Sequence, residues 1–378
     1  MTARMTSRMQ QPDSPAALAD IVRHAAAHDT PIRLVGGGTW LDAGGPFVDA
    51  SPVSLARLTG VIAYEPGDLV ITVAAGTTLA ELDAATRPHG QLLAVAPYGS
   101  RDSTIGACLT TASPAPLALG DLAMRDLVLG VDVITGAGET ARAGGRVVKN
   151  VAGFDLVRLH IGAWGTLGAI TEVTLRLHAV PHVDAIMVGT LEQDVAHALP
   201  ALVANRAPLP MLVRLRPNRA AELWARVSGN TQRAAALTDR LSALGVTALS
   251  HVADTQPLRD TAHDAVVLRT RTAVSDAVPF VLAAQQAFPE AELLYDPARG
   301  SLRIVQPLAL AQGDGDPLDA RIARFMGTAA TSGAQHPISV VIDQGRTIPH
   351  ERNPIEQGLK RAMDPRDVMN RYRPSHTA

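Results

Sequence analysis

The order of apolar and polar residues predicts alternating helices and strands in the first third of the chain. Ser14-Pro15 places a helix N-cap before a proline that suits a first turn, and apolar residues then recur at helical spacing to about His28. Short apolar runs predict strands at residues 31–35 and 69–74. A helix through Leu79 and Leu82 should stop at Gly90.

The later pattern adds hairpins and a second domain. Residues 126–142 read as two strands joined by a Gly-Ala-Gly turn, which favours an α+β class. Beyond Pro181 glycines become rare, and strand-like DAIMVGTL, MLVRLRP, DAVVLRTRT and SLRIVQPL alternate with helix-like runs at 231–244 and 275–287. These runs predict helices packed on an antiparallel sheet. We expect a flexible tail (1–14), a first domain (15–181), a cap domain (182–335) and a segment that returns to the first domain (336–378).

Composition limits the partners and the compartment. The length of 378 residues suits two domains, and 34 Lys plus Arg against 36 Asp plus Glu argue against nucleic acid as a bulk partner. A single cysteine, Cys108, excludes an internal disulfide and fits a reducing, cytoplasmic setting. We expect no transmembrane segment, because no run of about 18 apolar residues occurs. Peripheral attachment to the inner membrane through partners stays open.

Two glycine-rich stretches carry the candidate chemistry. The loop of Gly36, Gly37, Gly38, Thr39 and Trp40 follows a predicted strand, and it is either a phosphate cradle or an ordinary flexible turn. It lacks the G-x-G-x-x-G pattern that opens a long helix, which disfavours a nicotinamide site. Residues 144–174 hold six glycines, and such density indicates backbone laid against a cofactor.

Four motifs occur in the order seen in a known family: the Gly-Gly-Gly-Thr loop, AGTTLAEL at 75–82, Pro97 to Gly106, and KNVAGFDL at 149–156. In this the chain resembles the vanillyl-alcohol oxidase and p-cresol methylhydroxylase (PCMH) superfamily, and within it the FAD-binding subunits of bacterial glycolate oxidases. The resemblance implies a PCMH-type fold of two FAD-binding subdomains with an α+β cap. It also implies FAD contacts at the glycine loop and at Pro97, Gly99, Ser103, Thr104, Ile105, Gly106, Ser113, Gly165, Thr166, Gly168 and Ile170.

Lys149 and Asp155 are the charged residues of the most specific motif. A cation near the flavin could stabilise negative charge on its reduced form. A surface lysine and a helix-capping aspartate are the alternative, and we favour that structural role for both.

Departures from the catalytic relatives are informative. Those relatives have a glutamate where Trp164 stands, and the non-catalytic glycolate oxidase subunit resembles this chain in having an aromatic there. They also carry a His-x-His metal and base site, whereas no two histidines here are so spaced. His178 and His182 flank Pro181 in β-like sequence, so we expect two exposed histidines rather than a metal pair.

The remaining motif residues concern the chain's end and the mode of flavin attachment. Asp364-Pro365 and Asn370 echo the family's terminal Asp-Pro…Asn-Pro-Gly, with Arg371-Tyr372 in place of Pro-Gly. Cys108 is most simply a buried filler, with a covalent flavin link as the alternative. Because the loops also lack a histidine, we expect non-covalent FAD.

The resemblance implies a subunit of a glycolate oxidase (glycolate dehydrogenase) complex. Its partners would be a larger catalytic flavoprotein and an iron–sulfur subunit, and the complex would oxidise a small 2-hydroxy acid. Two alternatives remain: a self-sufficient FAD-dependent 2-hydroxy-acid dehydrogenase of the D-lactate kind, and a scaffold with a vestigial flavin site. Residue patterns fix neither the substrate nor the catalytic residues.

Overall fold

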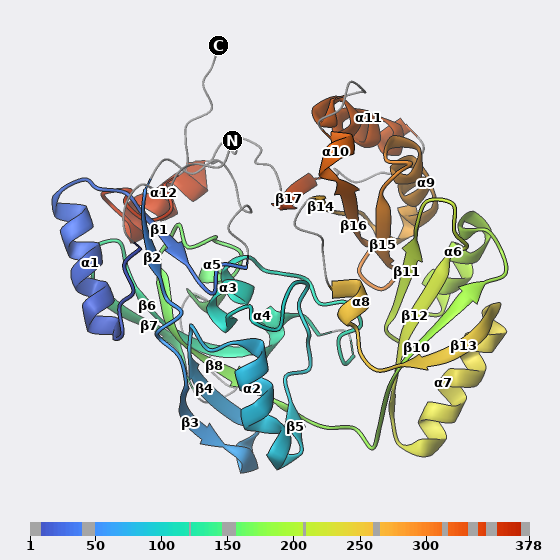
Figure 1. Cartoon of the computed structure of the whole chain (residues 1–378), viewed down its shortest axis with the longest axis horizontal. Helices are drawn as coiled ribbons and strands as arrows, with labels where there is room; N and C mark the ends of the chain where they lie inside the picture. The colour runs from blue at the N-terminus through green and yellow to red at the C-terminus, as the bar shows by residue number, and fades with distance from the viewer. Residues whose placement is uncertain are drawn as a thin grey trace. The chain divides into compact units, whose positions relative to one another are not determined.

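The chain folds into two compact units (Figure 1). The first unit comprises residues 1–114, 123–180 and 348–378, and the cap unit comprises residues 115–122 and 181–347. The computed structural model describes residues 9–39, 50–120, 122–145, 156–206, 209–259, 265–311, 317–331, 339–344 and 354–371.

The first unit mixes short helices with two kinds of sheet. A five-stranded antiparallel sheet has the order β3-β4-β8-β6-β7, and a separate parallel pair joins β1 to β2. Its strands are β1 (Ile32–Val35), β2 (Ser51–Ser54), β3 (Val61–Glu65), β4 (Val70–Ala74), β5 (Gln91–Leu92), β6 (Val128–Ile134), β7 (Thr140–Gly144), β8 (Ala169–Arg176) and β9 (His178–Ala179). Its helices are α1 (Pro15–Ala27), η1 (Pro66–Asp68), α2 (Leu79–Thr86), η2 (Arg87–His89), α3 (Ile105–Thr110), α4 (Met124–Leu127), α5 (Leu156–His160) and α12 (Pro354–Met363).

Local sequence signals account for several of these boundaries. The Ser14 hydroxyl accepts a hydrogen bond from the Ala17 N–H at 3.2 Å and caps α1 as predicted. Thr78 and Glu81 form a capping box at the start of α2, and Gly90 ends the helical segment at a φ of 65°. The predicted hairpin at 126–142 is confirmed as β6 and β7.

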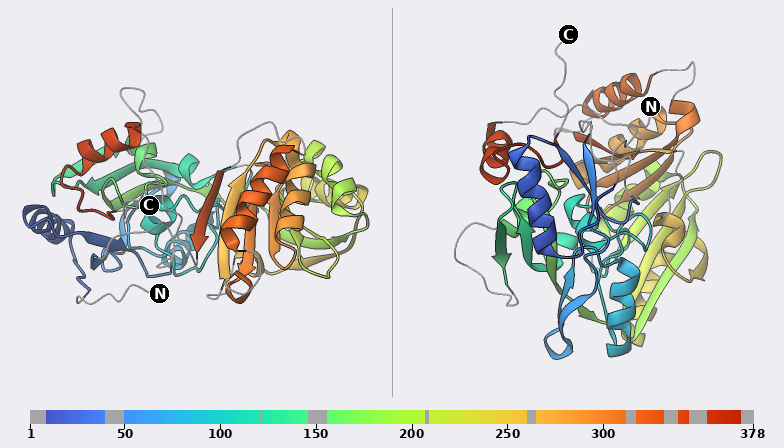
Figure 2. Two further views of the ribbon diagram at one scale, coloured as in Figure 1. Left: turned by 90° about the horizontal axis from the view of Figure 1, so that it is seen from above. Right: turned by 60° about the vertical axis from the view of Figure 1, so that its left-hand side comes forward.

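Helix α12 and its following loop pack onto the first unit beside α1. The Gly136 N–H, in the β6–β7 turn, donates to the Met363 carbonyl at 2.8 Å. Arg23 of α1 donates to the Gly138 carbonyl of the same turn at 2.8 Å. Both helices therefore contact one turn of the five-stranded sheet, and Figure 2 draws α1 in dark blue and α12 in red. The segment around α12 is thus built into the first unit.

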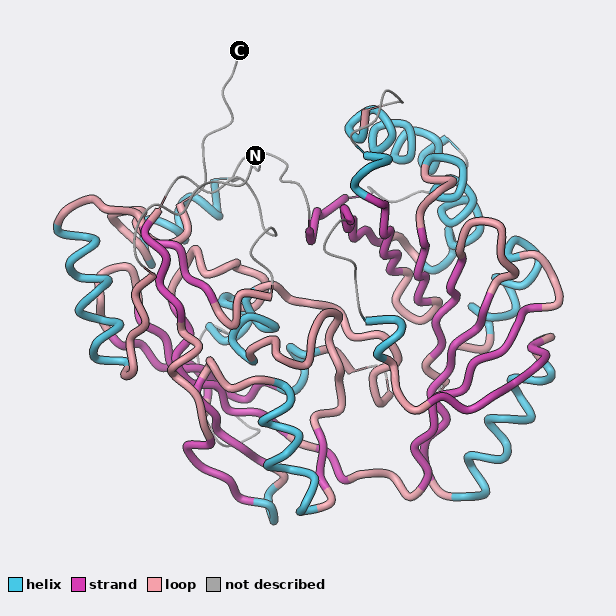
Figure 3. The backbone as a smooth tube through the Cα atoms, viewed as in Figure 1, coloured by secondary structure: helices cyan, strands magenta, loops and turns pink. Residues whose placement is uncertain are grey.

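The cap unit is an eight-stranded antiparallel sheet of order β13-β10-β12-β11-β15-β16-β14-β17. Buried residues of four helices, α6, α7, α9 and α11, share one core with the sheet, so these helices cover one face (Figure 3). The strands are β10 (Val183–Leu191), β11 (Met211–Leu215), β12 (Glu222–Gly229), β13 (Val246–Val252), β14 (Ala265–Arg271), β15 (Glu292–Asp296), β16 (Ser301–Pro307) and β17 (Ser339–Gln344). The helices are α6 (Val195–Ala204), α7 (Thr231–Ala243), α8 (Gln256–Arg259), η3 (Val274–Asp276), α9 (Ala277–Ala287), α10 (Leu308–Ala311) and α11 (Leu318–Thr331).

Three expected boundaries are wrong. Strand β17 pairs with β14 in the cap sheet, so only residues 348–378, and not all of 336–378, belong with the first unit. Residues 115–122 group with the cap unit although they lie inside the expected range of 15–181. The expected tail of 1–14 is also too long, because the Gln10 backbone N–H donates to the Pro52 carbonyl at 2.9 Å, which fixes it against β2. For β17 and Gln10, backbone pairing with a distant strand decides the outcome.

None of the described helices combines the length and the apolar character that crossing a membrane requires.

Candidate functional site

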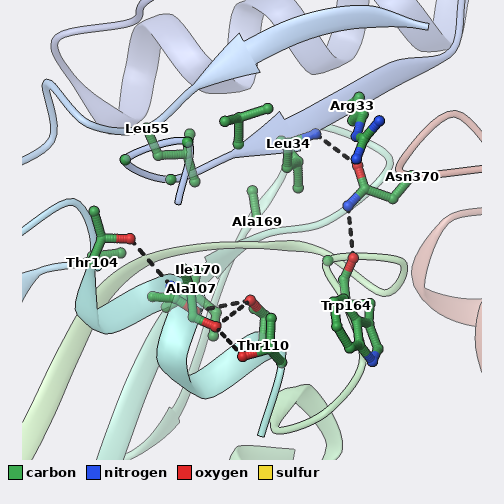
Figure 4. A pocket seen from close by; sticks show the side chains of 18 of the residues that line it. Arg33, Leu34, Leu55, Thr104, Ala107, Thr110, Trp164, Ala169, Ile170 and Asn370 are labelled. Carbon is green, nitrogen blue, oxygen red and sulfur yellow. Dashed lines mark hydrogen bonds between the residues drawn. The ribbon is translucent and has the colours of Figure 1, made fainter. Parts of the chain in front are cut away.

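A pocket lies within the first unit, where four separate segments meet. It encloses about 800 Å³ of space between atoms, part of it open to solvent. The walls come from β1 and its glycine loop, from α3, from the glycine turn before β8, and from Asn370 near the end of the chain (Figure 4). The described lining residues are Arg33, Leu34, Val35, Gly36, Gly37, Gly38, Thr39, Leu55, Ala75, Thr104, Gly106, Ala107, Thr110, Thr111, Trp164, Gly165, Gly168, Ala169, Ile170 and Asn370.

The glycine loop after β1 lies against the start of α3. A Cβ on Gly36 would come within 2.5 Å of the Thr104 Oγ1, and one on Gly37 within 2.9 Å of the Asp102 carbonyl oxygen. Gly38 has a φ of 80°, which favours glycine. The Thr39 hydroxyl is 3.0 Å from the hydroxyl of Ser103. Glycine at these positions therefore lets the loop approach the helix closely while its backbone faces the pocket.

The α3 wall is held tightly to Ala75, the residue directly after β4. The Gly106 N–H donates to the Ala75 carbonyl at 2.8 Å, and a Cβ on Gly106 would lie 2.9 Å from the Ala75 Cβ. Thr104 caps the helix by accepting from the Ala107 N–H at 3.3 Å. Thr104, Ala107 and Thr111 present small side chains to the pocket at helical spacing.

The glycine turn before β8 supplies the wall opposite the glycine loop of β1. Trp164 has a φ of 53°, which is unusual for a bulky residue, and Gly165 follows with a φ of 68°. The Trp164 N–H donates to the Thr110 carbonyl at 2.8 Å, and the Gly162 N–H donates to Leu109 at 3.0 Å. The turn is therefore tied by its backbone to the end of α3. Gly168 directly precedes the central strand β8, and Ile170 is its second residue.

A buried ion pair fixes the chain's end beneath this turn. The Lys360 ammonium donates to the Thr166 carbonyl at 2.7 Å and to the Asp364 carboxylate at 2.6 Å, and its side chain is only 5 % exposed. Asp364 also accepts from the backbone N–H groups of Val368 and Met369 at 3.1 and 2.8 Å. Asp364 and Asn370, which resemble the family's terminal motif, thus belong to a segment that is attached to the pocket wall.

Nine of the predicted cofactor residues line the pocket: Gly36, Gly37, Gly38, Thr39, Thr104, Gly106, Gly165, Gly168 and Ile170. Six others lie outside its lining: Pro97, Gly99, Ser103, Ile105, Ser113 and Thr166. Of these, Ser103 shares a hydrogen bond with the Thr39 hydroxyl, and the Thr166 carbonyl accepts from the Lys360 ammonium. The Ser113 hydroxyl donates to the Tyr98 carbonyl at 3.4 Å. Trp40, Lys149 and Asp155 lie outside the described residues. Contact of each predicted residue with FAD stays a prediction.

Sequence reasoning missed part of the lining. Arg33, Leu34 and Leu55 lie in β1 and in a loop whose packing no local motif reveals, and Ala75 opens the AGTTLAEL motif but was not among the predicted contact residues. Ala107, Thr110 and Thr111 could have been found, because they continue the helical spacing that begins at Thr104. Cys108, on the same helix, is buried and absent from the described lining.

The electrostatics of the site come from a few groups. In the described lining, Arg33 is the charged residue, and the other polar groups are hydroxyls, the Asn370 amide, the Trp164 indole and backbone atoms. Nearby, burial lowers the pKa of His160 to about 4, so this side chain is neutral at pH 7. His160 lies beside Gly168, its Cε1 3.4 Å from the position of a Cβ there. Across the described residues, no cluster of His, Cys, Asp or Glu is arranged to hold a metal ion.

These features fit a large planar cofactor that carries phosphates. Glycine-lined backbone allows a flat ring system or a pyrophosphate to approach closely, and hydroxyls and one guanidinium suit phosphate oxygens. FAD has both parts.

Comparison with known proteins agrees with this chemistry. Residues 7–144 match the family described as FAD binding domain. The chain is 36 % identical over 171 residues to the glycolate oxidase subunit GlcE of Escherichia coli K12, covering 45 % of this chain and 48 % of that protein. It is 31 % identical over 225 residues to a D-lactate dehydrogenase of Archaeoglobus fulgidus, covering 58 % and 49 %. The chain thus spans about half the length of these relatives.

The fold also has solved counterparts. The structure of p-cresol methylhydroxylase with substrate bound matches with a TM-score of 0.71 at 15 % identity, covering 96 % of this chain and 87 % of that one. This likeness confirms the predicted mixed α+β, PCMH-type fold with antiparallel sheets. Residues 7–144 therefore match an FAD-binding domain, the chain has the fold of p-cresol methylhydroxylase, and FAD is its cofactor.

Proposed function

We propose that the chain is the FAD-binding subunit of a glycolate oxidase-type complex that oxidises a small 2-hydroxy acid to the 2-oxo acid. The observation that carries the proposal is the similarity to GlcE, which reaches 36 % identity over 171 residues. Its partners would be a larger catalytic flavoprotein and an iron–sulfur protein. The chain would be cytoplasmic, with any membrane attachment supplied by those partners.

The pocket residues define what this chain would contribute. When bound, FAD would supply a redox group that can take up electrons and pass them on. The glycine loop and Thr39 would hold the pyrophosphate, with Arg33 supplying positive charge. The glycine turn at 164–168 would support the ring by its backbone. Binding would be non-covalent, since Cys108 is buried in α3.

The make-up of the described lining supports a subunit that carries electrons rather than one that removes the substrate proton. Hydroxyl, amide, indole and guanidinium groups do not act as general bases at neutral pH. The larger subunit would then supply the base. Within the complex, this flavin would pass or store electrons.

A second candidate is a self-sufficient 2-hydroxy-acid dehydrogenase. The match to the D-lactate dehydrogenase favours it, because that alignment covers 58 % of the chain, against 45 % for GlcE. The base would then come from another part of the chain.

An anaerobic visible spectrum of the purified, FAD-loaded chain separates the two candidates. The subunit proposal predicts that the flavin stays oxidised after excess glycolate or D-lactate and that dithionite then bleaches it. Bleaching by either acid would refute the proposal in favour of the dehydrogenase. Purification of the tagged chain from its own cells should in addition yield a glycolate-oxidising complex, and an eluate without that activity would contradict the subunit assignment.

A further inference from the structure

Asn370 joins two walls of the pocket through its side chain. Its Oδ1 accepts a hydrogen bond from the Leu34 N–H at 2.6 Å, and its Nδ2 donates to the Trp164 carbonyl at 2.6 Å (Figure 4). Leu34 precedes the glycine loop, and Trp164 begins the opposite glycine turn. One amide group thus connects segments that lie 336 and 206 residues away in the sequence.

The Trp164 turn depends on outside support because its backbone is strained. A bulky residue at a φ of 53° costs free energy and persists only where its surroundings fix it. Its N–H is held by Thr110 and its carbonyl by Asn370. Gly165 completes the fit, since a Cβ there would lie 2.8 Å from the Asn370 Nδ2. Glycine at 165 and asparagine at 370 are therefore complementary.

Asn370 is itself held in place from both sides. Its backbone N–H donates to the Ile32 carbonyl at 2.9 Å, and the Ile32 N–H donates to the Val368 carbonyl at 2.8 Å. Residues 368–370 thus pair with β1, and Asp364 with Lys360 fixes the loop before them. The φ of 42° at Asn370 suits asparagine better than most residues. Its amide is therefore presented to the pocket in one orientation.

We propose that Asn370 is a positioning residue for FAD. Its side chain couples docking of residues 364–371 to the shape of the flavin pocket. It sets the spacing between the glycine loop and the Trp164 turn before the cofactor binds. By reciprocity, bound FAD should then stabilise the docked segment by the same factor. This inference concerns cofactor retention and stands whether or not the chain is a glycolate oxidase subunit.

Two substitutions test the side chain without disturbing its backbone. Asn370→Gly removes both hydrogen bonds but tolerates the positive φ, and Asn370→Asp keeps the acceptor for Leu34 while losing the donor to Trp164. Asn218→Gly is the matched control, because Asn218 is exposed, has a φ of 55° and lies in the cap unit. We expect the FAD dissociation constant of Asn370→Gly to rise about tenfold or more, from the lost contacts to buried backbone. Asn370→Asp should show at least as large a rise, because a carboxylate oxygen would face the Trp164 carbonyl where Asn370 has a donor, and the control should show none.

The visible circular dichroism of the bound flavin distinguishes positioning from a purely structural role. A repositioned pocket should alter the flavin bands of Asn370→Gly at full saturation, whereas simple loss of stability would leave them unchanged. A folded Asn370→Gly protein with the control's dissociation constant and flavin bands would overturn the proposal.

Hydrogen exchange of the unmodified protein tests the coupling even if a variant fails to fold. Saturating FAD should slow amide exchange of peptides covering residues 364–371 several-fold relative to the apoprotein. Equal exchange in that segment, alongside slowed exchange in the glycine loop, would show that FAD binds without stabilising residues 364–371 and would also overturn the proposal.

Discussion

Replacing Gly36 by alanine should damage the glycine loop in a way that the structure quantifies. The new Cβ would lie 2.5 Å from the Thr104 Oγ1 and 3.1 Å from the Ala107 Cβ. Thr104 must rotate away, which removes its N-cap bond to Ala107 at a cost of about 1 kcal/mol. Crowding against α3 adds about 1–3 kcal/mol, and reduced freedom of the unfolded chain returns about 0.4–1 kcal/mol. We expect a net loss of about 2 kcal/mol.

Gly67→Ala is the matched control for this prediction. Gly67 also lacks a positive φ, but a Cβ there would have no neighbour within 4 Å. Thermal unfolding of the apoproteins should show Gly36→Ala melting about 4–8 °C below the wild type, as expected for a unit of this size, with Gly67→Ala at or slightly above the wild type. FAD affinity, measured by fluorescence quenching, should fall at least tenfold only for Gly36→Ala. If both variants melt and bind FAD alike, the close approach of the loop to α3 is wrong.

Two further predictions concern buried charge. Lys360→Met leaves the Asp364 carboxylate buried without its cation, so urea unfolding should show a free energy of unfolding lower by about 3–5 kcal/mol. Arg361→Met, at an exposed neighbour, should change it little. Equal effects of the two substitutions would contradict the role assigned to Lys360. Burial lowers the pKa of His160 from 6.5 to about 4. Between these pH values the imidazole is protonated in the unfolded chain and neutral in the folded chain. The free energy of unfolding should therefore fall by up to about 3 kcal/mol as the pH drops from 6.5 to 4. His160→Gln should flatten this part of the pH profile, and an unchanged slope in the variant would refute the assignment.

Local signals in the sequence predicted the parts of the fold that depend on short-range chemistry. The Ser14 cap, the hairpin of β6 and β7 and the end of the helical segment of α2 and η2 at Gly90 follow from capping and turn preferences within a few residues. The motif resemblance located nine residues of the pocket lining, because closely packed glycines leave a recognisable spacing.

Features that depend on distant pairing escaped prediction. Strand β17 was assigned to the wrong unit, since nothing in its own sequence distinguishes an edge of the cap sheet from a strand of the first unit. The role of Asn370 was equally hidden, because its partners at Leu34 and Trp164 are far away in the chain. Such contacts are settled by tertiary packing rather than by local preference.

The central claim, that the pocket of the first unit binds FAD non-covalently, is tested most directly by titrating the purified apoprotein with FAD and then precipitating it with acid. We expect saturation at one FAD per chain, with all of the flavin released into the supernatant. Absence of binding at saturating FAD, or flavin that remains in the protein pellet, would contradict it.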